Sequence, residues 1–469
     1  MPFRAFPRLA IFGFLGVFSL LAQACASSAT SETAVVEANV AAVEESSTTT
    51  ATPSDEAISS EPAPIVVEDA DTVSPTTSTS SDVDESSEES SAEESSGAAS
   101  SGDVSADGGV EPSNAEPAST TTTTATTTTT QTPTTTAVPS ASLGCAADID
   151  LEQRVGQLMF PLVTQSELPV AAALAERGLI GGVVVLGNPT ASIQSEIAAM
   201  QERSQFGPLI VAVDEEGGRV QRLASITSAL PSARSVAQNQ TLDQARELAR
   251  DHAVAIGELG FTMNLAPVVD LDNGGFIQSR SFGSDNELVT DYGFATADGI
   301  LDAGLTPVVK HFPGHGRGTD SHTGLPTLPG LDVLRADDLV PFVRAVERGD
   351  LPIMIGHLVV PGLTDGQPAT LSSAAINGLL RNELGFDGLV MTDAFNMDAI
   401  SDTTSDAEAA RLSIGAGVDL VMLGGLGAVE GTVAAVVAAV EAGEITDDSI
   451  TESFLRVLDT RGISSDCTG

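Results

Sequence analysis

Basic side chains are scarce in this chain of 469 residues. Lysine occurs once, at Lys310, and 65 acidic residues face only 20 lysines and arginines, which leaves a formal net charge of −45. A surface with this balance repels the phosphate backbone of nucleic acids, so nucleic acid is excluded as an expected partner. The excess of acidic side chains over basic ones favours solubility. The few arginines are interpreted as standing where a planar hydrogen-bond donor is needed.

Long apolar runs are also rare. The run IFGFLGVFSLLA at residues 11–22 follows Arg4 and Arg8 and leads into a small-residue pattern that ends at Ala24. This run is shorter than the ~20 residues that a membrane-spanning helix needs. A charged start, an apolar middle and a small-residue end are typical of an export signal, so we expect residues 1–24 to be removed and the protein to be exported.

Cysteine occurs only three times, at Cys25, Cys145 and Cys467. A cut after Ala24 would leave Cys25 as the first residue, which resembles a bacterial lipoprotein on the extracellular face of the cell membrane. Secretion without a lipid is the alternative, and a lipid on Cys25 is the only expected link to a membrane. In an exported protein, Cys145 and Cys467 are expected to form a disulfide that ties together the two ends of the folded part.

Residues 25–143 contain no lysine or arginine and are rich in Ser, Thr, Ala, Glu and Pro. A segment of this composition buries too little apolar surface to offset the entropy lost on ordering, so it is predicted to be a disordered stalk. A tether that holds a domain away from a membrane, a plain spacer and a glycosylated stalk all fit this composition.

Eight short apolar segments alternate with helical stretches in residues 144–469. In order, the segments are LMFPLV, GGVVVLG, PLIVAVD, FTMNLAP, TPVVKHF, PIMIGHL, LVMTDA and DLVML. Amphipathic runs such as LDQARELARDHAVAIGELG lie between them, and many end in glycine, as helices often do. Eight strand–helix repeats predict one α/β domain of the (β/α)8 TIM-barrel type, with a doubly wound open sheet as the alternative.

Polar side chains stand where several of these segments end. They are Asp214, Asn264, Lys310, His311, His357 and Asp393. In a barrel of parallel strands the carboxyl ends meet on one face, and that face carries the active site. The sequence therefore predicts that these side chains converge.

Three of the five histidines share the stretch KHFPGHGRGTDSH, residues 310–322, with the single lysine. A metal site formed by His311, His315 and His322 is one interpretation, but the proline and glycines between them disfavour a helix, and no zinc-binding pattern is present. The glycines match no phosphate-binding motif, and no serine lies in a Gly-x-Ser-x-Gly elbow.

Acid–base catalysis is the interpretation that remains for this stretch. Asp320 lies two residues before His322 on a glycine-rich loop, close enough to bond one ring nitrogen and fix the tautomer, so that the imidazole can protonate a leaving group. Asp393, at the end of a later strand, is the candidate partner, because glycoside hydrolysis with retention needs an acid and a carboxylate nucleophile.

Several stretches, taken together, resemble glycoside hydrolase family 3, and specifically its β-N-acetylglucosaminidases. They are VDEEGGRVQRL, NLAPVVD, SRSFGSD, KHFPGHG followed by DSH, PATLS and LRNELGFDGLVMTDAFNM. The resemblance covers about residues 150–460 and implies a barrel, retention of configuration and no cofactor or metal.

The resemblance also implies roles for individual residues. Asp393 is the expected nucleophile, His322 the general acid and base, and Asp320 its orienting partner. The residues expected to hold the hydroxyl and acetamido groups of the sugar are Asp214, Arg222, Arg280, Lys310 and His311. The family's frequent second Asp after the nucleophile is Ala394 here, and the loop before Asp320 is one residue shorter than usual.

The sequence thus predicts an exported exo-β-N-acetylglucosaminidase, monomeric, that removes terminal N-acetylglucosamine from cell-wall oligosaccharides or muropeptides. A phosphorylase that uses the same chemistry is one alternative, because a histidine acid leaves room for an anionic phosphate acceptor. A surface carbohydrate-binding protein without turnover is the other.

Overall fold

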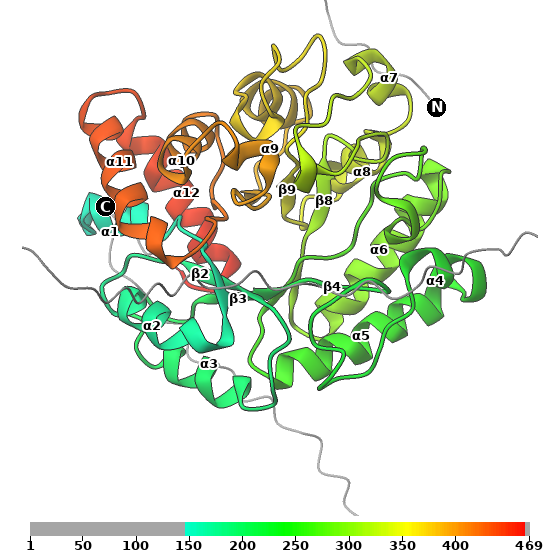
Figure 1. Ribbon diagram of the computed structural model, residues 1–469, viewed down its shortest axis with the longest axis horizontal. Helices are drawn as coiled ribbons and strands as arrows, with labels where there is room; N and C mark the ends of the chain where they lie inside the picture. Colours follow the sequence, from blue (N-terminus) through cyan, green and yellow to red (C-terminus); the bar gives the residue numbers. More distant parts are fainter. Residues whose placement is uncertain (1–145, 465–469) are drawn as a thin grey trace, which may run out of the picture. The chain divides into compact units, whose positions relative to one another are not determined.

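A computed structural model describes residues 146–464 of the chain (Figure 1). The expected export signal, the stalk and the three cysteines Cys25, Cys145 and Cys467 lie outside the described residues. Within the described part, no helix combines the length and apolarity needed to cross a bilayer.

The strands are short and mostly parallel. They are β1 (Leu162–Thr164), β2 (Gly182–Leu186), β3 (Ile210–Val213), β4 (Glu215–Gly217), β5 (Val220–Gln221), β6 (Met263–Asn264), β7 (Thr306–Pro307), β8 (Val309–Phe312), β9 (Ile353–Ile355) and β10 (Val390–Thr392). Every residue of β3, β8, β9 and β10 is buried. Continuous burial is expected of parallel strands that are covered on both faces, and it explains the apolar runs of β3 and β9. β8 and β10 also bury polar side chains, namely Lys310, His311 and Thr392.

The parallel pairings run around a closed ring. One sheet has the order β1-β2-β3-β6-β7 and another has the order β8-β9-β10. Three isolated parallel bridges complete the ring: Val268 with Lys310 of β8, Met391 of β10 with Leu420, and Val421 with Met159 just before β1. The domain is therefore α/β with a barrel-like parallel sheet, and each of the eight predicted apolar segments takes part in it.

Helices lie around the strands in Figure 1. They are α1 (Leu151–Gly156), α2 (Leu168–Glu176), α3 (Ile193–Gln201), α4 (Ala233–Asn239), α5 (Leu242–Glu258), α6 (Asn286–Asp302), α7 (Leu331–Ala336), α8 (Val340–Arg348), the π-helix η6 (Ala374–Glu383), α9 (Asp398–Ser401), α10 (Asp406–Gly415), α11 (Val429–Glu441) and α12 (Asp447–Thr460). Short 3-10 turns are η1 (Ala146–Asp148), η2 (Gln165–Glu167), η3 (Gln278–Arg280), η4 (Ser321–Thr323), η5 (Ala369–Leu371) and η7 (Leu426–Ala428).

Local sequence explains where these helices begin and end. Thr241 caps α5 in a capping box with Gln244, so that two otherwise unpaired backbone donors are satisfied. α8 ends at Arg348 and is followed by Gly349, whose φ of 80° lies in the left-handed region that favours glycine. The structure confirms the predicted amphipathic helix LDQARELARDHAVAIGELG, which forms α5.

Two features of the fold bear on the site. The antiparallel hairpin of β4 and β5 follows β3 directly and projects from the carboxyl end of that strand. The turn η1 contacts the last helix α12, so the two ends of the described domain lie close together.

Candidate active site

One pocket gathers polar side chains at the carboxyl ends of the parallel strands. Its cavity volume is about 330 Å³, within the range of ~300–1,000 Å³ that is common for ligand sites. Its polar lining residues are Asp214, Glu216, Arg219, Arg222, Arg280, Lys310, His311, His315, Ser321, His322, Asp393 and Asn396. Seven of the eight expected catalytic and sugar-binding residues line this pocket, and the eighth, Asp320, contacts His322 beside it.

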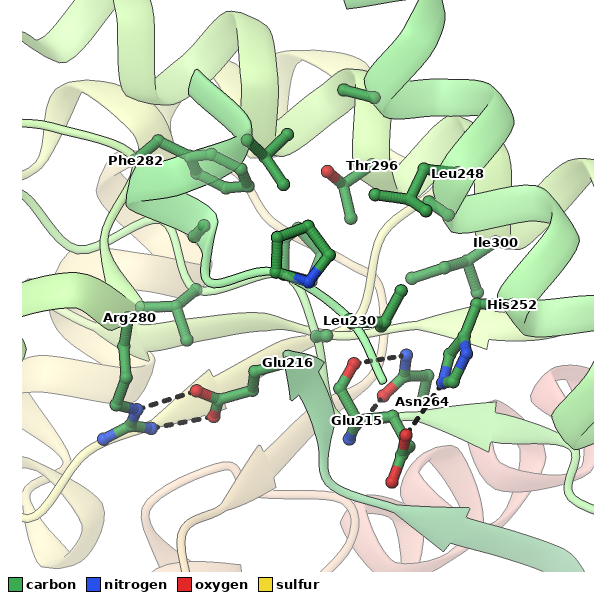
Figure 2. Close-up of a pocket in the computed structure, with 18 residues that line it drawn as sticks. Glu215, Glu216, Leu230, Leu248, His252, Asn264, Arg280, Phe282, Thr296 and Ile300 are labelled. Carbon is green, nitrogen blue, oxygen red and sulfur yellow. Dashed lines mark hydrogen bonds and ion pairs between the residues drawn. The ribbon is translucent and has the colours of Figure 1, made fainter. Parts of the chain in front are cut away.

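Lys310 lies at the centre of an ion-pair network on the wall of the pocket. Its Nζ is 2.8 Å from Oδ1 of Asp214 and 2.7 Å from Oε1 of Glu216. Arg280 donates two further bonds to Glu216, from Nε at 2.7 Å and from Nη2 at 2.8 Å, which Figure 2 shows as a fork on the carboxylate. Bidentate pairing of this kind fixes the orientation of both partners.

Glu216 is ionised in this network. Burial raises the pKa of its carboxyl, but the charges of Arg280 and Lys310 lower it more, so the pKa lies well below its usual range. The side chain of Glu216 is only 3% exposed, so its charge is balanced by these two cations rather than by water. The pocket wall is thus held rigid by charges that compensate one another.

Asp270 fixes the position of His311. Its carboxylate, which is fully buried, is 2.6 Å from Nδ1 of His311 and also accepts from the backbone N–H groups of His311 and His315. Burial raises the pKa of Asp270, but the charges and hydrogen bonds of His311 and His315 together lower it below its usual range. Since an ionised carboxylate only accepts, Nδ1 of His311 carries the proton and Nε2 faces the pocket.

Asp393 lies directly after β10, and its side chain is 10% exposed. Its Oδ1 accepts from the backbone N–H of Ala394 at 2.8 Å, and its Oδ2 is 3.9 Å from Nε2 of His311. Burial raises the pKa of Asp393, but the His311 imidazole and the Ala394 N–H help to lower it below its usual range. The carboxylate is therefore ionised near neutral pH, as a nucleophile must be.

His357 supports the backbone next to Asp393. Its Nε2 is 2.9 Å from the carbonyl oxygen of Ala394, and its Nδ1 is 2.8 Å from Oγ1 of Thr370. Burial lowers the pKa of His357, so the ring is neutral. Nε2 must then donate to the carbonyl, and Nδ1 accepts from the threonine hydroxyl.

The loop after β8 brings His322 to the mouth of the pocket. Oδ1 of Asp320 accepts from Nδ1 of His322 at 2.9 Å, and the imidazole remains 59% exposed. The pKa of Asp320 is lowered, because hydrogen bonds and charge from His322 outweigh the opposing effect of burial. Nδ1 of His322 therefore carries a proton, and Nε2 is left to exchange one with a ligand.

A buried pair, Glu215 and His252, fixes the backbone of Arg222. Oε1 of Glu215 accepts from the backbone N–H groups of Arg222 and Leu223, both at 2.6 Å, and Oε2 is 2.7 Å from Nε2 of His252 on α5. Figure 2 shows Glu215 and Glu216, although adjacent in sequence, bonded to different partners, His252 and Arg280. Within residues 146–464, the Arg222 guanidinium forms no ion pair and is left for a ligand.

The site contains residues that sequence reasoning did not single out. Glu216 and Asp270 hold the sugar-binding candidates in place, and both stand in stretches that carry the family resemblance, VDEEGGRVQRL and NLAPVVD. His252 lies in the middle of a helix, where no local pattern marks it. Asn264, expected at a strand end, bonds the backbone of Glu215 instead of lining this pocket.

The histidine cluster does not form a metal site in the described residues. Nδ1 of His311 is hydrogen-bonded to Asp270, and Nδ1 of His322 is hydrogen-bonded to Asp320, so the two rings bond to different carboxylates. Among residues 146–464, no group of three or more His, Cys, Asp or Glu side chains is arranged to hold a metal ion.

Comparison with known proteins identifies the family. Residues 150–460 match the family described as Glycosyl hydrolase family 3 N terminal domain. Beta-hexosaminidase LpqI of Mycobacterium tuberculosis is 40% identical over 336 residues, which are 69% of this chain and 86% of LpqI.

Solved structures agree with this match. The structure of M. tuberculosis LpqI has 39% identity and a TM-score of 0.65, covering 70% of this chain and 99% of that one. A family 3 β-N-acetylglucosaminidase from Paenibacillus sp. str. FPU-7 has 35% identity and a TM-score of 0.62, covering 67% of this chain and 62% of that one. The chain belongs to glycosyl hydrolase family 3, as its motifs predict, and is a glycoside hydrolase.

Proposed function

We propose that this protein is a retaining exo-β-N-acetylglucosaminidase. The proposal is supported mainly by one arrangement: the ionised Asp393 and the exposed His322, oriented by Asp320, line the same pocket. The names of its relatives, beta-hexosaminidase and β-N-acetylglucosaminidase, point to the same substrate class.

In the first step, a carboxylate oxygen of Asp393 forms a bond to C1 of the terminal sugar. The bond between C1 and the leaving oxygen breaks, and that oxygen takes the proton from Nε2 of protonated His322. A neutral imidazole remains, and the sugar is covalently attached to Asp393. Because the acid is a histidine, no second carboxylate opposes the charge of the nucleophile.

In the second step, His322 acts as a base. Nε2 takes a proton from a water molecule while the water oxygen bonds to C1 and the bond from C1 to Asp393 breaks. Free sugar leaves, and the Asp393 carboxylate and the protonated His322 are restored. Asp320 holds Nδ1 throughout, so that the same nitrogen serves in both steps.

Asp214, Arg222, Arg280, Lys310 and His311 would bind the hydroxyl and acetamido groups of the terminal sugar. Carboxylates accept from hydroxyls, and ammonium and guanidinium groups donate to sugar oxygens. The Lys310–Glu216–Arg280 network supports this role, because groups that are already ordered lose little entropy on binding.

For the rest of the chain we propose the arrangement that the sequence predicts. Residues 1–24 would be an export signal, residues 25–143 a stalk, and residues 144–469 a catalytic (β/α)8 barrel closed by a disulfide between Cys145 and Cys467. A lipid on Cys25 would hold the enzyme at the outer face of the membrane, near cell-wall fragments. A non-reducing digest and mass spectrometry of the N-terminal peptide would test the disulfide and the lipid.

The activity is tested with the purified protein and two chromogenic substrates, 4-nitrophenyl β-N-acetylglucosaminide and 4-nitrophenyl β-glucoside. We expect turnover of the N-acetyl substrate only, and a loss of about 10³-fold or more in Asp393→Asn. Asp365→Asn is the matched control, because Asp365 is exposed and has a φ of 52°, which asparagine also tolerates.

Product analysis separates this proposal from its alternatives. Free N-acetylglucosamine, with or without phosphate in the buffer, supports hydrolysis, whereas a sugar 1-phosphate would indicate a phosphorylase. Sugar binding without turnover by the folded protein would indicate a carbohydrate-binding protein. Release of N-acetylglucosamine from purified peptidoglycan fragments tests the natural substrate.

A further inference from the structure

Most arginines in the described residues are paired with carboxylates, as expected in a chain with so many acids. Fourteen of them form ion pairs within 4 Å. Among residues 146–464, the three that form none are Arg219, Arg222 and Arg461. Arg461 is bonded to Gln157 and to backbone carbonyls, but Arg219 and Arg222 both line the active-site pocket.

The two pocket arginines differ in depth. Arg222 is half-buried and is already expected to bind the terminal sugar, whereas Arg219 is exposed, in the turn between β4 and β5. In a protein of net charge −45, the charge of such a guanidinium is not compensated by any carboxylate within 4 Å among the described residues. It is available to an anionic group that enters the pocket.

Arg219 is held in a defined orientation. Its guanidinium carbon lies 4.7 Å from the centre of the Phe276 ring, and its Nη2 donates to the carbonyl oxygen of Phe276 at 2.8 Å. Stacking and this hydrogen bond fix the plane of the guanidinium. Nε and Nη1 have no hydrogen-bond partner among the described residues, so two donors remain for a ligand.

The backbone of Phe276 is hydrogen-bonded to the loop that carries His322, the proposed general acid. The N–H of Phe276 donates to the carbonyl oxygen of Gly318 at 2.9 Å, and the N–H of Gly275 donates to that of Gly316 at 3.0 Å. Asp320 and His322 follow on the same loop. The leaving oxygen must lie within hydrogen-bond distance of His322, so Arg219 and Phe276 lie on the side of the pocket from which the leaving group departs.

We propose that Arg219, stacked on Phe276, is a specificity-determining residue that binds a carboxylate carried by the leaving group. The inference rests on the proposed function and adds to it a residue that selects among β-N-acetylglucosaminides, favouring those whose leaving group is an organic acid. The overall negative charge makes a local cation necessary for such a substrate, because acids elsewhere on the protein repel it.

The test compares two substrates that differ only in charge, 4-(carboxymethyl)phenyl β-N-acetylglucosaminide and the corresponding amide. The readout is the ratio of kcat/KM for the acid to that for the amide, which is unaffected by any loss common to both. Arg219→Gln should lower this ratio about three- to tenfold, the range for a partly exposed arginine–carboxylate pair. Arg219→Lys, which keeps the charge but not the planar fork, should give an intermediate ratio.

Arg344→Gln is the matched control, because it removes the same charge from an exposed position on α8, and it should leave the ratio unchanged. A ratio in Arg219→Gln within twofold of the wild type would overturn the proposal. So would phosphate-dependent formation of a sugar 1-phosphate that Arg219→Gln loses, since Arg219 would then bind the acceptor. If the wild type hydrolyses neither substrate, it is the proposed function that fails.

Discussion

Asp320 accepts two hydrogen bonds from His322, one from its backbone N–H at 3.0 Å and one from its ring Nδ1 at 2.9 Å. Both come to the same oxygen, Oδ1, so backbone and ring are fixed together. The imidazole itself is 59% exposed and has no other hydrogen-bond partner among the described residues. Its orientation at the pocket therefore depends on this one carboxylate.

Asp320→Asn should lower turnover by about 10- to 1,000-fold, because the amide no longer stabilises the protonated imidazole or selects its tautomer. The loss in kcat/KM should be larger for phenyl β-N-acetylglucosaminide than for the 4-nitrophenyl substrate, whose leaving group needs less protonation. Asp332→Asn, an exposed acid on α7, is the control. Equal losses on both substrates would remove Asp320 from acid catalysis.

Glu216→Gln should reduce both substrate binding and stability. The side chains of Lys310 and Glu216 are both 3% exposed, so removal of the carboxylate leaves buried cations with only part of their compensation. Loss of one partner of a buried pair costs about 3–5 kcal/mol in the free energy of unfolding. Urea denaturation would measure this change.

The matched control for Glu216→Gln is Glu408→Gln, which breaks an exposed pair with Arg411 on α10. It should cost about 1 kcal/mol or less, because water screens that pair. Similar costs for the two variants would show that the Lys310 network contributes little to stability.

The sequence was sufficient to predict the barrel-like fold and the residues that gather in the pocket. β3 and β9 are buried throughout and appear as apolar runs, whereas β8 and β10 lie in predicted segments that are mostly apolar. Parallel strands bring their carboxyl ends to one face. That geometry places Asp214, Lys310 and Asp393 together, although up to 179 residues separate them in the chain.

The partners of these residues could not be predicted in the same way. Glu215 and Glu216 are adjacent and chemically identical, yet one bonds His252 on α5 and the other bonds Arg280 at the pocket. Their directions depend on the bulged hairpin of β4 and β5, which hydrophobic periodicity does not reveal. Arg219 likewise becomes notable only once the ion pairs of the described residues are known, because Arg219 and Arg222 are the two pocket arginines that form none.

Stability should fall as the pH is lowered from 7 to 4. Burial lowers the pKa of His315 and His357, and the charge of His311 lowers that of His315 further, although Asp270 and Asp393 oppose this. Below about pH 6.5, these two histidines become protonated in the unfolded chain but stay neutral in the folded protein. The free energy of unfolding therefore decreases as the pH falls below this value.

A second loss should follow below about pH 4, where the carboxyls of the unfolded chain become protonated. Glu216, Asp270 and Asp393 have lowered pKa values in the folded state, so their contribution is present above the unfolded pKa and is lost as the pH falls toward the folded one. Free energies of unfolding at pH 7, 6, 5, 4, 3 and 2 would show both losses. A constant free energy between pH 7 and 5 would contradict the neutral state assigned to the two histidines.

Gly316→Ala should displace the acid loop. A Cβ at this position would lie 1.7 Å from the carbonyl oxygen of Leu271 and 2.7 Å from its carbonyl carbon, and these backbone atoms cannot move aside as a flexible side chain could. The loop from Gly316 to Gly318 is also bonded to Gly275 and Phe276, so a shift moves both His322 and Phe276. We expect turnover to fall by about 10²-fold or more, because a displacement of about 1 Å at the reacting groups is enough for such a loss.

Gly427→Ala is the control for Gly316→Ala, because nothing lies within 4 Å of its Cβ, and it should retain full turnover. Normal activity in Gly316→Ala would mean that the loop adjusts without moving His322, and that its fit against Leu271 does not position the acid.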